Sequence, residues 1–294
     1  MVSTKPIKLI YIVGNGHSGS TLLDIFLGSH SQIESGGEIF TFSDFFSSKS
    51  QRNESKRFCT CGVHVEECDY WQKVRQQLNL NSRSFELDVD VEDLKEFEEN
   101  NFKLISTILE ISEKTIFCDS SKGFGRLKRF LKSKLFDVTV VHLVRDGRAV
   151  SFSRQKIVAR RSGRPDAWNE YVTDYFKKLE SWKSRNTRIY NRLNSDPRYL
   201  CIRYEDFVVN PRTKVTEILN KLNLEFEDQQ LIFWKTVHHN LAGNRWRKQM
   251  NPGTPQTIQR DISYLENLPQ HQWMLSNISA SEELKLFGYS TARE

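Results

Sequence analysis

Short runs of apolar residues recur along the chain, and longer segments with helical spacing separate them. The runs are rich in β-branched side chains and cover four segments: Ile7–Val13, Thr115–Cys118, Val138–Val144 and Tyr199–Ile202. Continuous apolar runs of this length are typical of strands that are buried on both faces of a parallel sheet. Because a turn and then a helical pattern follow each run, we predict an α/β fold with crossover helices.

The segments between the runs predict two long helices and one binding loop. Apolar residues three or four positions apart indicate a helix within Asn169–Leu193. Pro211 is suited to the first turn of a second helix, which continues to Leu222. The segment His238–Pro255 is polar and contains glycine and aromatic residues, which favours a binding loop. No repeat or linker divides the chain, so we predict a single domain over residues 1–294, with helical insertions.

Composition excludes some classes of protein and leaves others open. With 38% hydrophobic and 27% charged residues, the chain of 294 residues is not disordered or fibrous. The longest apolar stretch near the N-terminus, Leu9–Val13, is too short for a membrane span or a signal-peptide core, so we expect a cytoplasmic protein. The net charge of +6 favours anionic ligands. Nucleic acid, acidic lipid and phosphorylated small molecules all remain open.

Three of the five cysteines lie close together in the sequence, with a histidine among them: Cys59, Cys61, His64 and Cys68. These four side chains have the donor types of a zinc site, but ligands only one residue apart are awkward for tetrahedral geometry. A metal site, a disulfide and a packed turn all remain open. We therefore assign no metal ligand at this stage and expect no metal requirement.

A glycine-rich turn follows the first predicted strand and precedes a helical segment, Leu22–Leu27. It contains Gly14, Gly16 and Gly19, and such a turn at a helix N-terminus is suited to an anion. A nucleoside triphosphatase loop is disfavoured, because Ser20 stands where that motif has its lysine. A dinucleotide site is also disfavoured, because no apolar run precedes an acid about 20 residues later. Two interpretations of the turn remain: a site for a phosphate that is not part of a triphosphate, and a turn with a purely structural role.

The same turn resembles the 5′-phosphosulfate loop of sulfotransferases that use 3′-phosphoadenosine 5′-phosphosulfate (PAPS). In that family a basic residue precedes a Ser-Gly-[Ser/Thr]-[Ser/Thr] tetrad at the start of a helix. Here the tetrad is Ser18-Gly19-Ser20-Thr21, and His17 stands where arginine or lysine is usual. The resemblance implies that Gly16 and the residues from His17 to Thr21 bind PAPS.

A second motif lies about 125 residues later, at the end of the run Val138–Val144. Arg145 follows this strand, and Ser153 follows eight residues after it. Taken alone, this is a surface arginine with a helix cap. The 3′-phosphate site of the same family is similar, with a strand-end arginine and a serine eight positions later. The resemblance therefore implies that Arg145 and Ser153 bind the 3′-phosphate.

Weaker resemblances extend the match to about residues 7–250. Tyr204 lies in a segment similar to the family's Tyr-Glu-Asp-Leu motif, and Asn244 and Arg247 lie in a loop similar to one that closes near the cofactor. Lys122 lies in a segment that carries a lysine in tyrosylprotein and bacterial sulfotransferases. The cysteine cluster also recurs in bacterial relatives. The implied fold is a P-loop-like parallel sheet flanked by helices, the sulfotransferase fold.

The resemblance also implies a reaction, the in-line transfer of the sulfuryl group of PAPS to a hydroxyl or amine of a small molecule. Glu38 is the expected base, because it lies 21 residues after His17, the offset found in tyrosylprotein sulfotransferases. Lys122 and His17 are expected to neutralise the leaving phosphate. A secondary metabolite, a carbohydrate and a lipid remain open as acceptors. The competing classes are a nucleotide kinase with an altered loop and a nucleic-acid-binding module that uses the basic stretch Arg145–Arg164.

Overall fold

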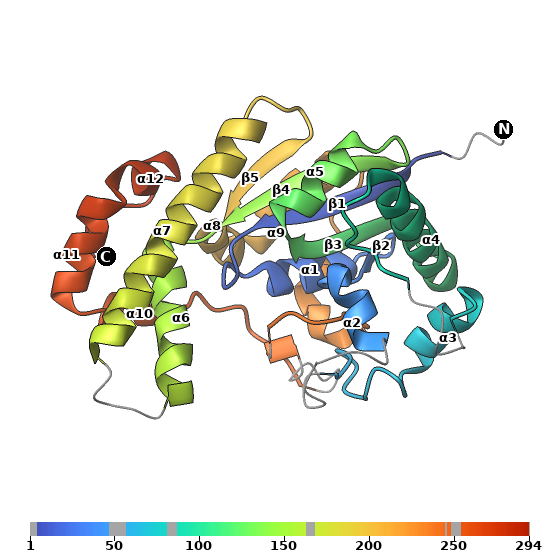
Figure 1. Cartoon of the computed structure of the whole chain (residues 1–294), viewed down its shortest axis with the longest axis horizontal. Coiled ribbons are helices and arrows are strands. Elements are labelled where there is room, and N and C mark those ends of the chain that lie inside the picture. The colour runs from blue at the N-terminus through green and yellow to red at the C-terminus, as the bar shows by residue number, and fades with distance from the viewer. Residues whose placement is uncertain are drawn as a thin grey trace. The chain divides into compact units, whose positions relative to one another are not determined.

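The computed structural model describes residues 5–46, 57–80, 87–162, 168–244, 246–247 and 254–293. Its centre is a parallel five-stranded sheet in the order β2-β3-β1-β4-β5 (Figure 1). The strands are β1 (Ile7–Gly14), β2 (Ile33–Ser35), β3 (Ile116–Lys122), β4 (Phe136–Val144) and β5 (Tyr199–Arg203). The predicted α/β class and the four predicted strands are confirmed.

The fifth strand, β2, is the one that the apolar pattern did not indicate. It is only three residues long and contains a single large apolar side chain, Ile33, which is fully buried. Its conformation follows from pairing with β3, in which Ile33 lies opposite Ile116 and Ser35 lies opposite Cys118. A segment this short has too little pattern of its own to be recognised as a strand.

The helices follow the strands in the alternation that the sequence predicts. They are α1 (Ser20–Gly28), α2 (Phe42–Phe46), α3 (Asp69–Gln77), α4 (Leu94–Ser112), α5 (Phe124–Lys132), α6 (Gly147–Ser162), α7 (Trp168–Leu193), α8 (Tyr204–Val209), α9 (Pro211–Asn220), α10 (Ser263–Asn267), α11 (Gln270–Ser279) and α12 (Ser281–Leu286), with two 3-10 helices, η1 (Ile39–Thr41) and η3 (Asp228–Lys235). Helices α7 and α9 confirm the two predicted helices, and α9 ends at Asn220 rather than at Leu222.

The chain folds into two compact units. The first contains Met1–Val13, Ser20–Val141 and Val215–Thr257, and the second contains Gly14–Gly19, His142–Lys214 and Ile258–Glu294. The glycine-rich turn therefore belongs to the second unit, while the helix α1 that follows it belongs to the first. The sequence-based expectation of a single domain over the whole chain stays a prediction.

In the first unit, helices cover both faces of the strands. The chain passes from β1 through α1 to β2 in one direction along the sheet, and returns through α4 and α5 in the opposite direction. Because crossovers between parallel strands are right-handed, α1 lies on one face and α4 and α5 on the other, as Figure 1 shows. Ligands of open α/β sheets bind where such connections diverge, beyond the carboxyl ends of the strands.

The second unit has its own hydrophobic core, built mainly by α6, α7 and the C-terminal helices α10–α12. Tyr175 and Trp182 of α7 are fully buried in it, together with Leu284 of α12. The start of α6 lies close to α7, because a Cβ atom on Gly147 would lie 2.6 Å from the Trp182 ring. In the described part of the chain, we find no helix with the length and apolar character that crossing a bilayer requires.

Candidate active site

Glycine is required at two positions of the turn that joins β1 to α1. Gly14 has a φ of +150°, and a Cβ atom on it would lie 2.5 Å from the carbonyl oxygen of Leu143. Gly19 has a φ of +88°, and a Cβ atom there would lie 2.4 Å from the Tyr204 ring. Both conformations are costly for residues with a side chain, and both contacts leave no room for one. The turn is therefore held close to its neighbours through its backbone.

The buried serine of this turn has an unused hydroxyl group. The Ser18 side chain is 1% exposed, and its Oγ has no hydrogen-bond partner among the described residues. A buried hydroxyl without a partner is unfavourable, so it marks a position where a ligand atom would be stabilised. Helix α1 begins at Ser20, so its N-terminal N–H groups and its dipole also favour an anion at this place.

Three residues from distant parts of the sequence form one hydrogen-bonded group in the second unit: His17, Arg145 and Ser153, called here the arginine group. Nη1 of Arg145 donates to the carbonyl oxygen of His17 at 3.1 Å. Oγ of Ser153 lies 3.1 Å from Nδ1 of the His17 ring. The structure therefore brings together the residues that the two sequence motifs singled out separately.

Both ring nitrogens of His17 lie near side chains of α6. Nε2 lies 3.5 Å from Nη1 of Arg154, a group that can only donate. His17 also has a φ of 70°, a left-handed conformation that is uncommon for residues other than glycine but that histidine adopts more often than most. The His17 side chain is thus part of the local hydrogen bonding around Arg145 and Ser153.

Besides its contact with His17, Arg145 makes three further contacts of different kinds. Its guanidinium lies over the Tyr204 ring, 4.7 Å from the ring centroid. Nε1 of Trp182 donates to the backbone carbonyl oxygen of Arg145 at 2.9 Å. Its Nη2 atom lies 3.0 Å from Oδ2 of Asp261. Its Nε atom is buried and has no hydrogen-bond partner among the described residues. Arg145 is thus oriented by the protein and retains one unused donor.

Asp261 is a member of this site that the sequence analysis missed. Burial alone would raise its pKa, but hydrogen bonds from Ser263 and Arg145 outweigh burial and lower the pKa to about 2. The carboxylate is therefore charged at neutral pH and pairs with the Arg145 guanidinium. No motif surrounds Asp261, and only the fold brings it to an arginine 116 residues away.

A second pair of predicted residues meets in the first unit. Lys122 is the last residue of β3, where it pairs with Val13 of β1, directly before the glycine-rich turn. Its Nζ atom lies 2.5 Å from Oε1 of Glu38, and both side chains are largely buried, with 14% and 21% exposed. Nζ also donates to the carbonyl oxygen of Ser120 at 3.2 Å. The glutamate–lysine pair, Glu38 and Lys122, therefore places a carboxylate and an ammonium group together at the end of β3.

The late loop that the sequence analysis indicated, of which residues 238–244 and 246–247 are described, contacts both the pair and α1. The backbone N–H of Glu38 donates to the carbonyl oxygen of Leu241 at 2.9 Å. The N–H of Leu241 donates to the carbonyl oxygen of Gly36 at 3.1 Å. At the other end of the loop, the N–H of Asn244 donates to Oγ1 of Thr21 at 3.0 Å. The loop thus fixes the backbone beside Glu38 and orients the Thr21 hydroxyl.

Two buried residues anchor this loop to the first unit. Nδ2 of Asn240 donates to Oδ2 of Asp24 at 2.6 Å, and burial raises the pKa of Asp24 to about 7. Arg247 donates to the carbonyl oxygens of Phe58 at 2.8 Å and of Asn240 at 3.1 Å. The guanidinium of Arg247 is therefore engaged by the protein, and its predicted contact with the cofactor stays a prediction.

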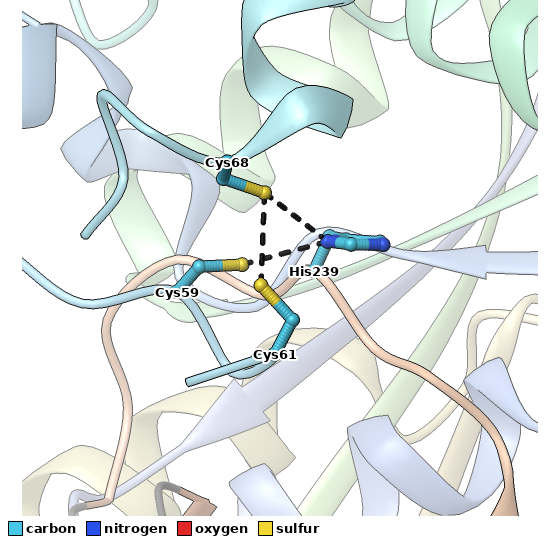
Figure 2. Close-up of side chains that lie close together, drawn as sticks. All are labelled: Cys59, Cys61, Cys68 and His239. Carbon is cyan, nitrogen blue, oxygen red and sulfur yellow. Dashed lines mark hydrogen bonds between the residues drawn. The ribbon is translucent and has the colours of Figure 1, made fainter. Parts of the chain in front are cut away.

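The clustered cysteines meet a histidine, but not the one that is nearest in the sequence. Cys59, Cys61 and Cys68 lie around His239 of the late loop, and these four residues are called the Cys3His cluster (Figure 2). His64 instead sits in an antiparallel bridge with Phe58, and its ring lies edge-on to the Phe58 ring at 5.8 Å. His239 lies 171 residues after Cys68, so no local spacing could have indicated it.

Comparison with solved structures identifies the same fold in two sulfotransferase domains. The sulfotransferase domain from the curacin biosynthetic pathway aligns with a TM-score of 0.62 at 21% identity, covering 98% of this chain and 99% of that one. The sulfotransferase domain of the Synechococcus PCC 7002 olefin synthase aligns with a TM-score of 0.55 at 20% identity, covering 99% of this chain and 98% of that one. At these identities, the likeness establishes the fold.

A third solved structure and two sequence comparisons complete this picture. Sulfotransferase STF9 from Mycobacterium avium aligns with a TM-score of 0.51 at 12% identity, covering 98% of this chain and 78% of that one. A search of curated proteins finds no match. The model of the sulfotransferase family, however, matches residues 10–228, which include the glycine-rich turn, the glutamate–lysine pair and the arginine group. The chain therefore belongs to the sulfotransferase family.

Proposed function

We propose that this sulfotransferase uses PAPS and transfers its sulfuryl group to a hydroxyl or amine of a small-molecule acceptor. The observation that carries the proposal is the arginine group. Arg145 and Ser153 lie 128 and 136 residues from His17 in the sequence, yet both contact it. The family places its 3′-phosphate residues and its 5′-phosphosulfate loop at these positions. A chance resemblance at two separate motifs would not require their residues to meet.

The residues present fit a doubly phosphorylated nucleotide. Ser18 and Arg145 each have a buried polar atom, Oγ and Nε, that has no hydrogen-bond partner among the described residues. We assign the 3′-phosphate to Arg145 and Ser153, with Tyr204 supporting the guanidinium. The 5′ side is assigned to the turn from Gly16 to Gly19, to Ser20 and to Thr21, whose hydroxyl Asn244 orients. When bound, PAPS supplies the sulfuryl group and a phosphate leaving group.

The glutamate–lysine pair supplies the two charges that the transfer requires. In the proposal, the Glu38 carboxylate accepts the proton of the acceptor hydroxyl, and Lys122 stabilises negative charge on the leaving phosphate oxygen. The contact of 2.5 Å between them keeps the carboxylate next to a cation and orients both groups. His17 is proposed to help neutralise the leaving phosphate, and its ring also contacts Ser153 and Arg154.

The acceptor class is proposed from two neighbours in structure. Both are described as sulfotransferase domains of biosynthetic systems, one for curacin and one an olefin synthase, and both align over nearly their whole length. We therefore propose a small secondary metabolite as the acceptor. Labelled PAPS and a panel of small hydroxyl and amine compounds, sugars and lipids would test this part. Transfer to the sugars or lipids alone would replace the small-metabolite assignment.

Binding measurements on two arginine variants test the use of PAPS. Arg145→Ala is expected to weaken binding of 3′-phosphoadenosine 5′-phosphate by at least about 10-fold, the loss of roughly one charge-assisted hydrogen bond. Binding of adenosine 5′-phosphosulfate, which lacks the 3′-phosphate, is expected to change little. Arg198→Ala is the matched control, because Arg198 pairs with Asp196 at 2.8 Å in the same unit and has no proposed role. Equal losses for both nucleotides in Arg145→Ala would refute the assignment.

The two competing classes receive less support from the described residues. Arg148, in the basic stretch, is buried and pairs with Asp146 at 2.6 Å, so its charge is already balanced within the protein. A nucleic-acid-binding module would show an affinity for DNA or RNA that falls steeply with salt. In a nucleotide kinase the loop lysine reaches the β- and γ-phosphates, and Ser20 stands at that position. ATP hydrolysis or γ-phosphate transfer by the purified protein would favour the kinase.

A further inference from the structure

The proposed sulfuryl transfer makes no use of the Cys3His cluster, although its four side chains converge on one point. Figure 2 shows the three sulfur atoms and the His239 ring directed toward a common centre. The donor atoms are Sγ of Cys59, Cys61 and Cys68 and one ring nitrogen of His239, all within 4.8 Å of one another. Cys59 and Cys68 are buried, with 0% and 1% of their surfaces exposed.

Three of the six distances between these atoms are close to the edges of a tetrahedron around a zinc ion, and the others are at most 4.8 Å. Ideal Zn–S and Zn–N bonds imply about 3.8 Å between two sulfur ligands and about 3.6 Å between sulfur and nitrogen. The Sγ atoms of Cys61 and Cys68 are 3.7 Å apart. Nδ1 of His239 lies 3.6 Å from Sγ of Cys59 and 3.3 Å from Sγ of Cys68. These three distances are therefore close to those expected around a bound zinc ion.

A tight turn explains how two cysteines one residue apart serve the same centre. The N–H of Gly62 donates to the carbonyl oxygen of Cys59 at 3.1 Å. The N–H of Cys59 donates to the carbonyl oxygen of Val63 at 2.9 Å. Gly62 has a φ of +95°, which a residue with a side chain rarely adopts. The chain bends back so sharply that the side chains of Cys59 and Cys61 both reach the centre. The close spacing, which the sequence analysis held against a metal, is accommodated by this glycine.

Neighbouring aromatic residues hold the His239 ring with Nδ1 facing the cluster. The ring stacks on Tyr70, with centroids 4.4 Å apart and planes inclined by 5°. Nε1 of Trp71 donates to the carbonyl oxygen of His239 at 2.8 Å. Both aromatic residues belong to α3, which begins directly after Cys68. The helix that follows the last cysteine therefore orients the histidine, as outer groups of metal sites commonly do.

We propose that the Cys3His cluster binds one Zn²⁺ ion as a closed structural site. Three thiolates and one imidazole are a ligand set that structural zinc uses, and the set lacks the oxygen ligands that calcium and magnesium prefer. All four positions of the tetrahedron are filled by protein, which leaves no place for a reacting water. On binding, the three thiols release their protons to solvent, and no electron transfer is involved.

The ion would join two segments that are far apart in the sequence. His239 is followed directly by Asn240 and Leu241, which hydrogen-bond to Asp24 and to the backbone of Glu38. Zinc binding would therefore fix the late loop against the segment of the three cysteines and stabilise the first unit. An effect of zinc on catalysis, through the position of Glu38, rests on the proposed function. Zinc content and folding stability do not depend on that function.

Metal analysis of two histidine variants tests the proposal. Protein produced in zinc-supplemented medium is expected to contain one Zn²⁺ per chain. The variant His239→Gln is expected to lose the zinc ion. The variant His64→Gln, which changes a histidine between Cys61 and Cys68 but outside the Cys3His cluster, is expected to retain it. Removal of the ion by a chelator is expected to lower the melting temperature of the wild type, and Zn²⁺ alone to restore it. Equal zinc content in the two variants, or no zinc in the wild type, would overturn the proposal.

A spectroscopic measurement on the wild type keeps the test valid if His239→Gln does not fold. Co²⁺ in place of Zn²⁺ is expected to give thiolate-to-metal charge-transfer bands and the intense visible bands of a tetrahedral site. Co²⁺ spectra without thiolate bands would refute the ligand set. A disulfide within the cluster, seen as a mass lower by two hydrogens in unreduced protein, would also refute the ligand set. The Sγ atoms of Cys61 and Cys68, 3.7 Å apart, are well beyond the roughly 2 Å of a disulfide bond.

Discussion

The substitution Glu38→Gln tests the chemical step most directly. Glutamine has nearly the size of glutamate and retains one oxygen that can accept a hydrogen bond from Lys122. It cannot take the proton that an acceptor hydroxyl must lose. The backbone N–H of Glu38 donates to the carbonyl oxygen of Leu241 at 2.9 Å and is unaffected by the change. The variant therefore removes the proposed base while leaving the local backbone in place.

The expected loss follows from the burial of the pair and from the usual effect of a general base. With 21% of the Glu38 side chain exposed, water has limited access to replace the carboxylate as the proton acceptor. A positioned base contributes about 10²- to 10⁴-fold in rate, which corresponds to about 3 to 5 kcal/mol of activation free energy. We expect the turnover number for a hydroxyl acceptor to fall within this range. An acceptor amine that is already neutral is expected to lose less.

Single-turnover transfer from labelled PAPS, at saturating acceptor, measures this step apart from product release. The affinity for 3′-phosphoadenosine 5′-phosphate, measured separately, is expected to change by less than about threefold, because a base acts in the transition state. Glu34→Gln is the matched control, since Glu34 is a glutamate of the same segment whose oxygens contact Lys114 at 3.0 Å and Tyr70 at 3.0 Å. Melting temperatures of both variants show whether the fold is retained.

Two outcomes would contradict the reasoning. If Glu38→Gln turns over within about threefold of the wild type, Glu38 is not the base, because the usual effect is far larger. If Glu34→Gln loses as much activity with its fold intact, Glu34 is the better candidate. Combining Glu38→Gln with Lys122→Met separates the roles further. Losses that multiply indicate independent roles, whereas a double variant no slower than one single variant indicates that the pair acts as a unit.

Three further predictions concern residues around the arginine group and the end of β4. His17→Arg is expected to retain transfer activity, because the family usually has a basic residue there, whereas His17→Ala loses it; equal rates for all three forms would remove His17 from the site. Asp261→Asn is expected to tighten binding of 3′-phosphoadenosine 5′-phosphate by roughly 10-fold, because its carboxylate contacts Arg145 at 3.0 Å and would compete with the phosphate; weaker binding by calorimetry would show that Asp261 supports the ligand instead. Burial lowers the pKa of His142 to about 4, so from about pH 6.5 to 4 the unfolded chain binds a proton that the folded one does not, and acidification across this window is expected to cost about 3 kcal/mol of stability. His142→Gln should lose less stability than the wild type across this window, and parallel melting-temperature profiles would exclude His142 as the cause.

The sequence predicted those parts of the fold and site that depend on local patterns. The four apolar runs became strands, and the motif residues Arg145 and Ser153 meet His17 because each motif follows a parallel strand. Two further site residues, Asp261 and His239, lie outside any motif. Each reaches its partner only through tertiary folding, across 116 residues for Asp261 and Arg145. Strand β2 was missed for the same reason, because its pairing with β3 determines its conformation.

The contact between Gly19 and Tyr204 has a consequence for how this sequence can change in evolution. A side chain at position 19 would collide with the Tyr204 ring, so a substitution there requires a smaller residue at position 204. The same ring lies beneath the guanidinium of Arg145, so a smaller residue would also remove the support of that arginine. The three positions are far apart in the sequence but constrain one another. Homologues are therefore expected to keep glycine and an aromatic residue together at these two positions or to change both. Those that change both should also hold the arginine in a different way.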